Sequence, residues 1–272
     1  MLALSRPRVL ITGATGFLGP YAVADWARLA SVVTLARKGA DIECDVADLA
    51  SLEAALVAVR PDHVLHLAAL SRMADCAADP VRARAVNVLP AQLLAERFGA
   101  QMLLVSTDLV FDGHSAPYGP LDGVAPLSVY GQTKAEAEEL VLAAGGRVAR
   151  LPLLFGSDAR MRGPTGAVRD AIENQQPAYL YTNEYRTPLH CRDAARGLVD
   201  LVHSPQLGRV VHLQGPERIS RWEFAQRFCT LRGLPTDQLT AVECQDATRP
   251  RDVSLAGAWQ PPRELDAMLA DC

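Results

Sequence analysis

A strand that runs into a glycine-rich turn lies near the start of this chain and limits the folds available to it. Residues 8–12 (Arg-Val-Leu-Ile-Thr) form a short run rich in apolar and β-branched residues, and Gly13, Gly16 and Gly19 follow at intervals of three before a run with helical periodicity. In this context Gly13 permits a tight turn, Gly16 lets backbone N–H groups approach a pyrophosphate, and Gly19 allows close packing of helix on sheet. The pattern predicts a dinucleotide-binding βαβ unit.

Strands and helices keep alternating after this turn. The sequence predicts further strands at 32–36, 63–68, 101–106 and 148–154, and helices at 17–29, 49–59, 80–98 and 127–144. Pro90 is expected to kink the helix at 80–98. The alternation is typical of an α/β protein with a Rossmann-type, doubly wound parallel sheet.

Beyond about residue 155 the alternation weakens. The remaining chain carries a short predicted strand at 178–181, a helix at 192–202, another strand at 210–213, and a capping box that opens a helix at Ser220. We therefore expect a dinucleotide-binding Rossmann domain over 1–155 and a smaller, substrate-binding C-terminal lobe over 156–272, some of whose segments return to the first domain.

Composition excludes several classes of partner. The 272 residues carry a net charge of −4, so we expect neither a nucleic-acid nor a membrane partner, and any anion site must be local. The first eight residues are too short an apolar run for a signal peptide, which favours a cytoplasmic location. The six cysteines show no C-x-x-C spacing, so we expect reduced thiols and no metal site.

The end of the second predicted strand bears on the choice of cofactor. A dinucleotide fold that binds NAD usually carries an acid there, but this chain has Arg37 and Lys38. A guanidinium suits a 2′-phosphate, so NADPH is favoured, with NADH and a solvated basic turn as alternatives. Asp45 and Val46 are candidates to bound the adenine, although Asp45 is equally compatible with an exposed loop.

Tyr130 and Lys134 form the candidate reacting pair. Residues i and i+4 share one face of a helix, so a phenol and an ammonium converge there. An adjacent ammonium favours the phenolate and so lowers the pKa of a tyrosine from its free value of about 10. Together with the glycine turn, the pair predicts a nicotinamide-dependent oxidoreductase.

Taken in order, these motifs resemble those of the extended short-chain dehydrogenase/reductase family over essentially the whole chain. The matching elements are the glycine turn, Leu67-Ala68-Ala69, Asn87, Ser106-Thr107-Asp108, Tyr130 with Lys134, and Arg150-Leu151-Pro152. Residues 106–113 (STDLVFDG) and 249–255 (RPRDVSL) are similar to dTDP-4-dehydrorhamnose reductase-like proteins, the sugar-nucleotide reductases within this family.

The resemblance implies a role for each member of the reacting set. Lys134 would hold the nicotinamide ribose, Tyr130 would protonate a ketone oxygen as hydride reaches the carbon, and Thr107 would polarise that oxygen. The expected cofactor-binding residues are Gly13, Thr15, Gly16, Phe17, Leu18, Gly19, Arg37, Asp45, Val46, Leu67, Ala68, Ala69, Asn87, Tyr130 and Lys134.

A nucleotide-linked sugar is the substrate that the resemblance implies. Arg186 and Arg249 match segments that place arginines near the substrate phosphates, and two guanidiniums suit a diphosphate. A surface salt bridge is the alternative for each of them. Asp108 is a second polar contact to substrate or the cap of a turn, and Ser71 completes the expected substrate-binding set.

Two departures from the family narrow these expectations. Gly19-Pro20-Tyr21 replaces the glutamate of the magnesium-linked dimers, so a metal-bridged dimer is not expected, while a homodimer remains open. Leu109 stands where dehydratases carry a glutamate, and leucine cannot move a proton, so dehydration is disfavoured. An epimerase and a non-catalytic, NADP-binding regulatory subunit remain as alternatives to the reductase.

Overall fold

The chain forms two compact units in the computed structural model, which describes residues 6–272. The first unit runs to Ser106 and also contains Ser128–Ala149 and Leu198–Val210, and the second contains Thr107–Leu127, Arg150–Gly197 and Val211–Cys272. Residues 1–5, on which most of the signal-peptide expectation rests, lie outside the described residues. The units therefore interleave along the chain: Leu198–Val210 returns to the first unit, and Thr107–Leu127, which lies before the predicted boundary at 155, belongs to the second.

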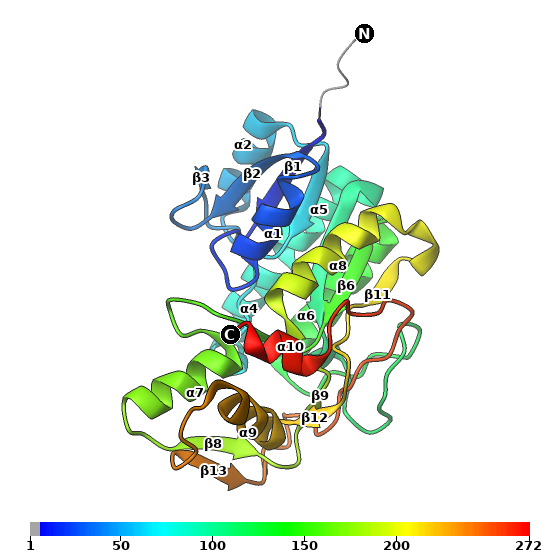
Figure 1. Ribbon diagram of the computed structural model, residues 1–272. Coiled ribbons are helices and arrows are strands. Elements are labelled where there is room, and N and C mark those ends of the chain that lie inside the picture. Colours follow the sequence, from blue (N-terminus) through cyan, green and yellow to red (C-terminus); the bar gives the residue numbers. More distant parts are fainter. Residues whose placement is uncertain (1–5) are drawn as a thin grey trace. The chain divides into compact units, whose positions relative to one another are not determined.

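A seven-stranded sheet organises the first unit. Its strand order is β11-β6-β5-β4-β1-β2-β3 (Figure 1). The strands are β1 (Arg8–Thr12), β2 (Ser31–Ala36), β3 (Ile42–Glu43), β4 (His63–His66), β5 (Met102–Thr107), β6 (Arg147–Leu151) and β11 (Val210–His212). The pairings of β1 with β2 and β4, of β2 with β3, and of β4 with β5 are parallel. This confirms the predicted Rossmann-type fold.

The helices of this unit cover the sheet. They are α1 (Gly19–Trp26), α2 (Leu49–Val59), α3 (Met73–Ala78), α4 (Pro80–Asn87), α5 (Leu89–Phe98) and α6 (Val129–Ala143), and α8 (Cys191–His203) contributes its second half. Figure 1 shows α1 on one face of the strands and α2 and α5 on the other. Both faces are thus covered, and Leu10, Leu35 and Leu104 in the central strands are fully buried.

The prediction of one kinked helix over 80–98 was wrong in its detail. Two helices, α4 and α5, meet at Val88, and Pro90 lies in the first turn of α5. A proline there costs no hydrogen bond, because the first N–H groups of a helix have no partner within it. Pro90 therefore marks the start of a helix and not a bend within one.

The second unit is built from short strands, three whole helices and the first half of α8. Its strand pairs are β7 (Leu154–Phe155) with β10 (Leu189–His190), β9 (Tyr185–Arg186) with β12 (Ile219–Ser220), and β8 (Ala178–Tyr181) with β13 (Leu239–Val242). The helices are α7 (Gly163–Glu173), α9 (Arg221–Arg232) and α10 (Leu265–Ala270). Phe155 packs edge-on against Phe224, with ring centroids 5.1 Å apart. The capping box predicted at Ser220 is present, since Glu223 and Ser220 exchange hydrogen bonds.

Among residues 6–272, none of the helices combines the length and the apolar character needed to cross a membrane.

We predict that His66 makes the fold sensitive to acid. Its Nδ1 pairs with Thr12 Oγ1 at 2.7 Å, and burial, aided by the charge of Lys134, lowers the pKa of His66 to about 3. The unfolded chain, with a His pKa near 6.5, binds a proton between these values that the folded state does not. The free energy of unfolding therefore falls as pH drops through this window, by about 2 kcal/mol per such group between pH 7 and 5.

Urea denaturation at pH 7 and 5 measures this effect. His66→Asn should remove about 2 kcal/mol of the difference between the two pH values, whatever its effect at pH 7. The exposed His63 supplies the control, because His63→Asn should leave the difference unchanged. An unaltered pH dependence in His66→Asn would contradict the assignment.

Candidate active site

The glycine turn is tight because two backbone segments approach closely. Gly13 has φ +68°, and a Cβ there would lie 2.6 Å from the backbone N of Ala68. A Cβ on Gly19 would lie 2.1 Å from the carbonyl oxygen of Ala14. No side chain fits at either position, so β1 and the segment after β4 meet backbone to backbone. Gly13 and Ala68, both predicted cofactor contacts, are thereby brought together.

The basic turn after β2 lies beside the glycine turn. A Cβ on Gly39 would be 4.0 Å from Thr15 Cγ2, and Arg37 and Lys38 are exposed just before it. The N–H of Gly39 donates to Glu43 Oε1 at 2.9 Å, which holds the turn in shape. Sequence reasoning missed Glu43, which lies on the two-residue strand β3.

Asp45 and Val46 follow β3. Asp45 is exposed, and its Oδ1 accepts from the N–H of Ala47 at 3.0 Å, while Val46 is buried in the core of the unit. Asp45 therefore caps its own turn through one carboxylate oxygen.

Helix α6 presents Tyr130 and Lys134. Ser128 caps the helix by accepting from the N–H of Gly131 at 3.1 Å. The Lys134 side chain is 2% exposed, and its Nζ donates to the carbonyl oxygen of Val105 at 2.7 Å. Burial lowers the pKa of Lys134 to about 8, against the opposing charge of Glu138. The ammonium thus lies at the end of β5, on the helix that carries the buried Tyr130.

Asn87 braces the same region. Its Oδ1 accepts from the N–H of Leu70 at 2.8 Å, and its Nδ2 donates to the Leu70 carbonyl at 3.1 Å and to Thr133 Oγ1 at 2.9 Å. The side chain ties the loop after β4 to helix α6. Thr133 had no signal in the sequence beyond its place one residue before Lys134. The predicted substrate residue Ser71 is exposed in the same loop.

Thr107 is the last residue of β5, Asp108 begins the 3₁₀ turn Asp108–Val110 that follows it, and both belong to the second unit. The Thr107 hydroxyl donates to Asp108 Oδ1 at 3.2 Å and accepts from the N–H of Leu109 at 3.2 Å. Burial raises the pKa of Asp108 to about 6, and the charge of Glu184 acts in the same direction, whereas Arg186 and Thr107 oppose them.

A buried arginine–carboxylate cluster surrounds Asp108. Arg186 Nε lies 3.3 Å from Asp108 Oδ2, and Arg186 Nη2 lies 3.3 Å from Glu184 Oε1. Arg249 donates from Nε at 2.9 Å and from Nη2 at 2.7 Å to Glu184 Oε2. Burial opposes ionisation of Glu184, but Arg186, Arg249 and Arg221 together outweigh it and lower the pKa of Glu184. Arg186 and Arg249, predicted at the substrate phosphates, are thus both paired with carboxylates.

Glu184 is the member of this cluster that the sequence analysis did not identify. It is 2% exposed and contacts both predicted arginines. Its spacing of two from Arg186 was a usable signal, because residues i and i+2 of an extended segment point to the same side.

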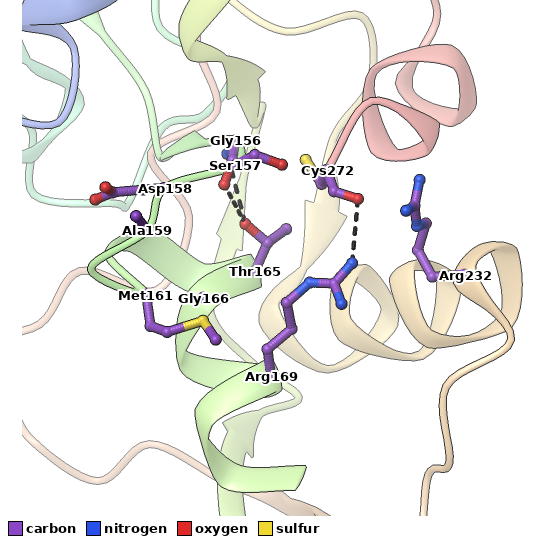
Figure 2. Close-up of a pocket in the computed structure, with 10 residues that line it drawn as sticks. All are labelled: Gly156, Ser157, Asp158, Ala159, Met161, Thr165, Gly166, Arg169, Arg232 and Cys272. Atoms are coloured by element: carbon purple, nitrogen blue, oxygen red, sulfur yellow. Dashed lines mark hydrogen bonds between the residues drawn. The ribbon is translucent and has the colours of Figure 1, made fainter. Parts of the chain in front are cut away.

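A cavity of about 450 Å³ lies within the second unit (Figure 2). Thr165 donates to the carbonyl of Gly156 at 2.9 Å, and Arg169 Nη2 donates to the carbonyl of Cys272 at 3.1 Å. Arg232, also in its lining, donates to the carbonyl of Ala270. None of the predicted site residues lines this cavity, and its two arginines donate to carbonyl groups at the last residue of α10 and at Cys272.

The described residues contain no group of three His, Cys, Asp or Glu side chains placed to hold a metal ion. All six cysteines are buried free thiols.

Comparison with known proteins places the chain in a family. The model of the RmlD substrate binding domain matches residues 7–258. The chain belongs to this family. It is 30% identical over 274 residues to methionine adenosyltransferase 2 subunit beta of Danio rerio, covering 93% of this chain and 80% of that protein. It is 29% identical over 264 residues to dTDP-4-dehydrorhamnose reductase of Mycobacterium tuberculosis (strain CDC 1551 / Oshkosh), covering 89% of this chain and 81% of that protein.

A solved structure with the same fold is dTDP-4-dehydrorhamnose reductase from Bacillus anthracis str. Ames in complex with NADP. The TM-score is 0.86, with 20% identity and 97% of each chain covered. This similarity is one of fold.

We predict that Asn87→Ala lowers the free energy of unfolding by about 2–4 kcal/mol, because it removes the hydrogen-bond partner of a half-buried backbone N–H of Leu70 and of the buried Thr133 hydroxyl. Urea denaturation measures the loss. Asn174 is the matched control, since its side chain is exposed and bonds only within the turn at Asp170. A loss as small as that of Asn174→Ala would refute the bracing role.

Proposed function

We propose that the protein is an NADP(H)-dependent reductase of a keto group on a nucleotide-linked sugar. The observation that carries the proposal is the buried Lys134 ammonium, held by the Val105 carbonyl one helical turn from Tyr130. A charged side chain that is 2% exposed costs stability, so its retention favours a role at a reacting centre. Membership of a family that contains dTDP-4-dehydrorhamnose reductases supports the same chemistry.

The first unit has a surface suited to the cofactor. Gly13 and Gly19 leave no room for side chains, so the backbone itself is available to a pyrophosphate. Arg37, beside the glycine turn, suits a 2′-phosphate, and Lys134 suits the ribose hydroxyls. Ser106 Oγ is buried without a hydrogen-bond partner among the described residues, leaving a polar atom for a ligand at the end of β5. When bound, NADPH supplies hydride to a carbonyl carbon.

Residues of this chain supply the proton and bind the substrate. Tyr130 delivers the proton that the carbonyl oxygen gains, and Thr107 polarises that oxygen by hydrogen bonding. We assign the nucleotide diphosphate to Arg249, whose side chain is 27% exposed. Arg186 is only 5% exposed, so we expect it to act through its ion pair with Asp108.

We predict that Tyr130→Phe lowers kcat about 10³-fold, because it removes the proton donor, and leaves NADPH affinity nearly unchanged. Steady-state turnover of dTDP-4-dehydrorhamnose and a fluorescence titration with NADPH measure the two quantities. Tyr179→Phe, at a tyrosine that is 66% exposed, is the control. Undiminished kcat in Tyr130→Phe would remove the basis for the mechanism.

We predict that Arg37→Ala weakens NADPH binding about tenfold or more, since one charge-assisted hydrogen bond contributes roughly 1.5–3 kcal/mol. NADH lacks the 2′-phosphate and should bind as before. Calorimetric titration with each nucleotide separates the two, and Arg28→Ala, at an exposed arginine, should affect neither. Equal losses for NADPH and NADH would mean that Arg37 does not select the cofactor.

The second candidate function is that of a non-catalytic, NADP-binding regulatory subunit. The observation that favours it is the similarity to methionine adenosyltransferase 2 subunit beta. Stable co-purification with a methionine adenosyltransferase, together with no turnover of keto sugars, would select this function. An epimerase of the same family would be recognised by turnover without net consumption of NADPH.

A further inference from the structure

The hydrogen bond that the Thr107 hydroxyl donates in the structure conflicts with its proposed role as a donor to the substrate carbonyl. A hydroxyl has a single proton to donate. In the structure Thr107 donates that proton to Asp108 Oδ1 at 3.2 Å, while the N–H of Leu109 occupies one of its lone pairs. An ionised Asp108 therefore competes with the carbonyl oxygen that Thr107 is proposed to polarise.

Protonation of Asp108 removes the competition. An ionised carboxylate only accepts hydrogen bonds, whereas a neutral carboxyl carries an O–H donor. The Asp108 O–H can then donate to Thr107 Oγ1, whose second lone pair is available, and the Thr107 proton is released for a ligand. The two states differ in the direction of one hydrogen bond and require no movement of the backbone.

We propose that Asp108 is a positioning residue that acts in its neutral form, turning the Thr107 hydroxyl toward the substrate carbonyl, and that Glu184 keeps it neutral by occupying Arg186. This inference rests on the proposed function, in which Thr107 contacts the carbonyl oxygen. Asp108 gives up no proton in the reaction, because the proton gained by that oxygen comes from Tyr130.

The surroundings of Asp108 favour the neutral form. Asp108 is 3% exposed, and the charged groups that interact with it are Arg186, Glu184 and Arg221. Arg186 is divided between the two carboxylates at 3.3 Å each, longer than the usual 2.7–2.9 Å of a charge-assisted hydrogen bond. Glu184 has Arg249 as well, so the better-stabilised anion is Glu184 and the proton goes to Asp108.

The pH dependence has a definite sign. Burial raises the pKa of Asp108 to about 6, so the neutral form dominates below that pH and is lost as pH rises through it. Polarisation by Thr107 should weaken in the same interval. Replacing Glu184 with a neutral residue frees Arg186 for Asp108, which favours the anion and moves the decline to lower pH.

The first experiment is a pH profile of kcat/KM for reduction of dTDP-4-dehydrorhamnose by NADPH. We expect the wild-type profile to fall between pH 6 and 7.5. The fall should be absent in Asp108→Asn, whose amide N–H donates to Thr107 at every pH, and should shift to lower pH by at least half a unit in Glu184→Gln. Glu173→Gln, at an exposed glutamate of α7, should retain the wild-type profile. A profile in Asp108→Asn that falls as in the wild type overturns the proposal.

The second experiment does not need turnover. In protein carrying ¹³C-carboxyl aspartate, the resonance lost in Asp108→Asn identifies Asp108, and its titration should be centred near 6 and move down in Glu184→Gln. Titration near the ordinary value of about 3.9 overturns the proposal. The two experiments can also fail separately. If the wild-type protein does not reduce keto sugars but its Asp108 titrates near 6, the reductase function is rejected and the Asp108–Thr107 pairing is retained.

Discussion

The close approach of the Gly13 backbone to that of Ala68 is the constraint on which the dinucleotide-binding unit depends. β1 pairs in parallel with β2 on one side and with β4 on the other. The order in which successive strands are added to the sheet therefore reverses at β1. Ligands of open parallel sheets bind at such a switch point, outside the carboxyl ends of the strands. A residue with a Cβ at Gly13 would push the two strand ends apart and close the backbone surface to a pyrophosphate.

Buried charge is the second theme of the structure. Lys134 in the first unit, and Asp108 with Glu184 in the second, are each at most 3% exposed, and none of them is left without partners. Burial pushes the pKa of Lys134 down and that of Asp108 up, so both titrate closer to neutrality than in water. Groups poised in this way are typical of active sites, because proton positions there can respond to a ligand.

Local patterns predicted most of the first unit. The strands at 8–12 and 32–36 and the helix at 49–59 follow from apolar runs and breakers, and the structure has them within a residue or so. β3 and α3 were not predicted, since two and six residues are too few for periodicity to register. Apolar periodicity runs through both α4 and α5, so it does not show that a new helix begins just before Pro90, where a proline is tolerated.

The sequence by itself predicted the alternation of strands and helices, the glycine turn and the placement of Tyr130 and Lys134 on one helix, because each of these patterns involves residues that are close together in the chain. The tertiary structure decided how the chain is divided between units, and which carboxylates the arginines contact. Glu184 and Arg249 are 65 positions apart, and Asp108 and Arg186 are 78 apart, yet each pair forms an ion pair. Such contacts arise when segments distant in the chain fold together, and no local pattern records them. The charge state of Asp108, and with it the direction of the Thr107 hydrogen bond, is therefore a property of the fold.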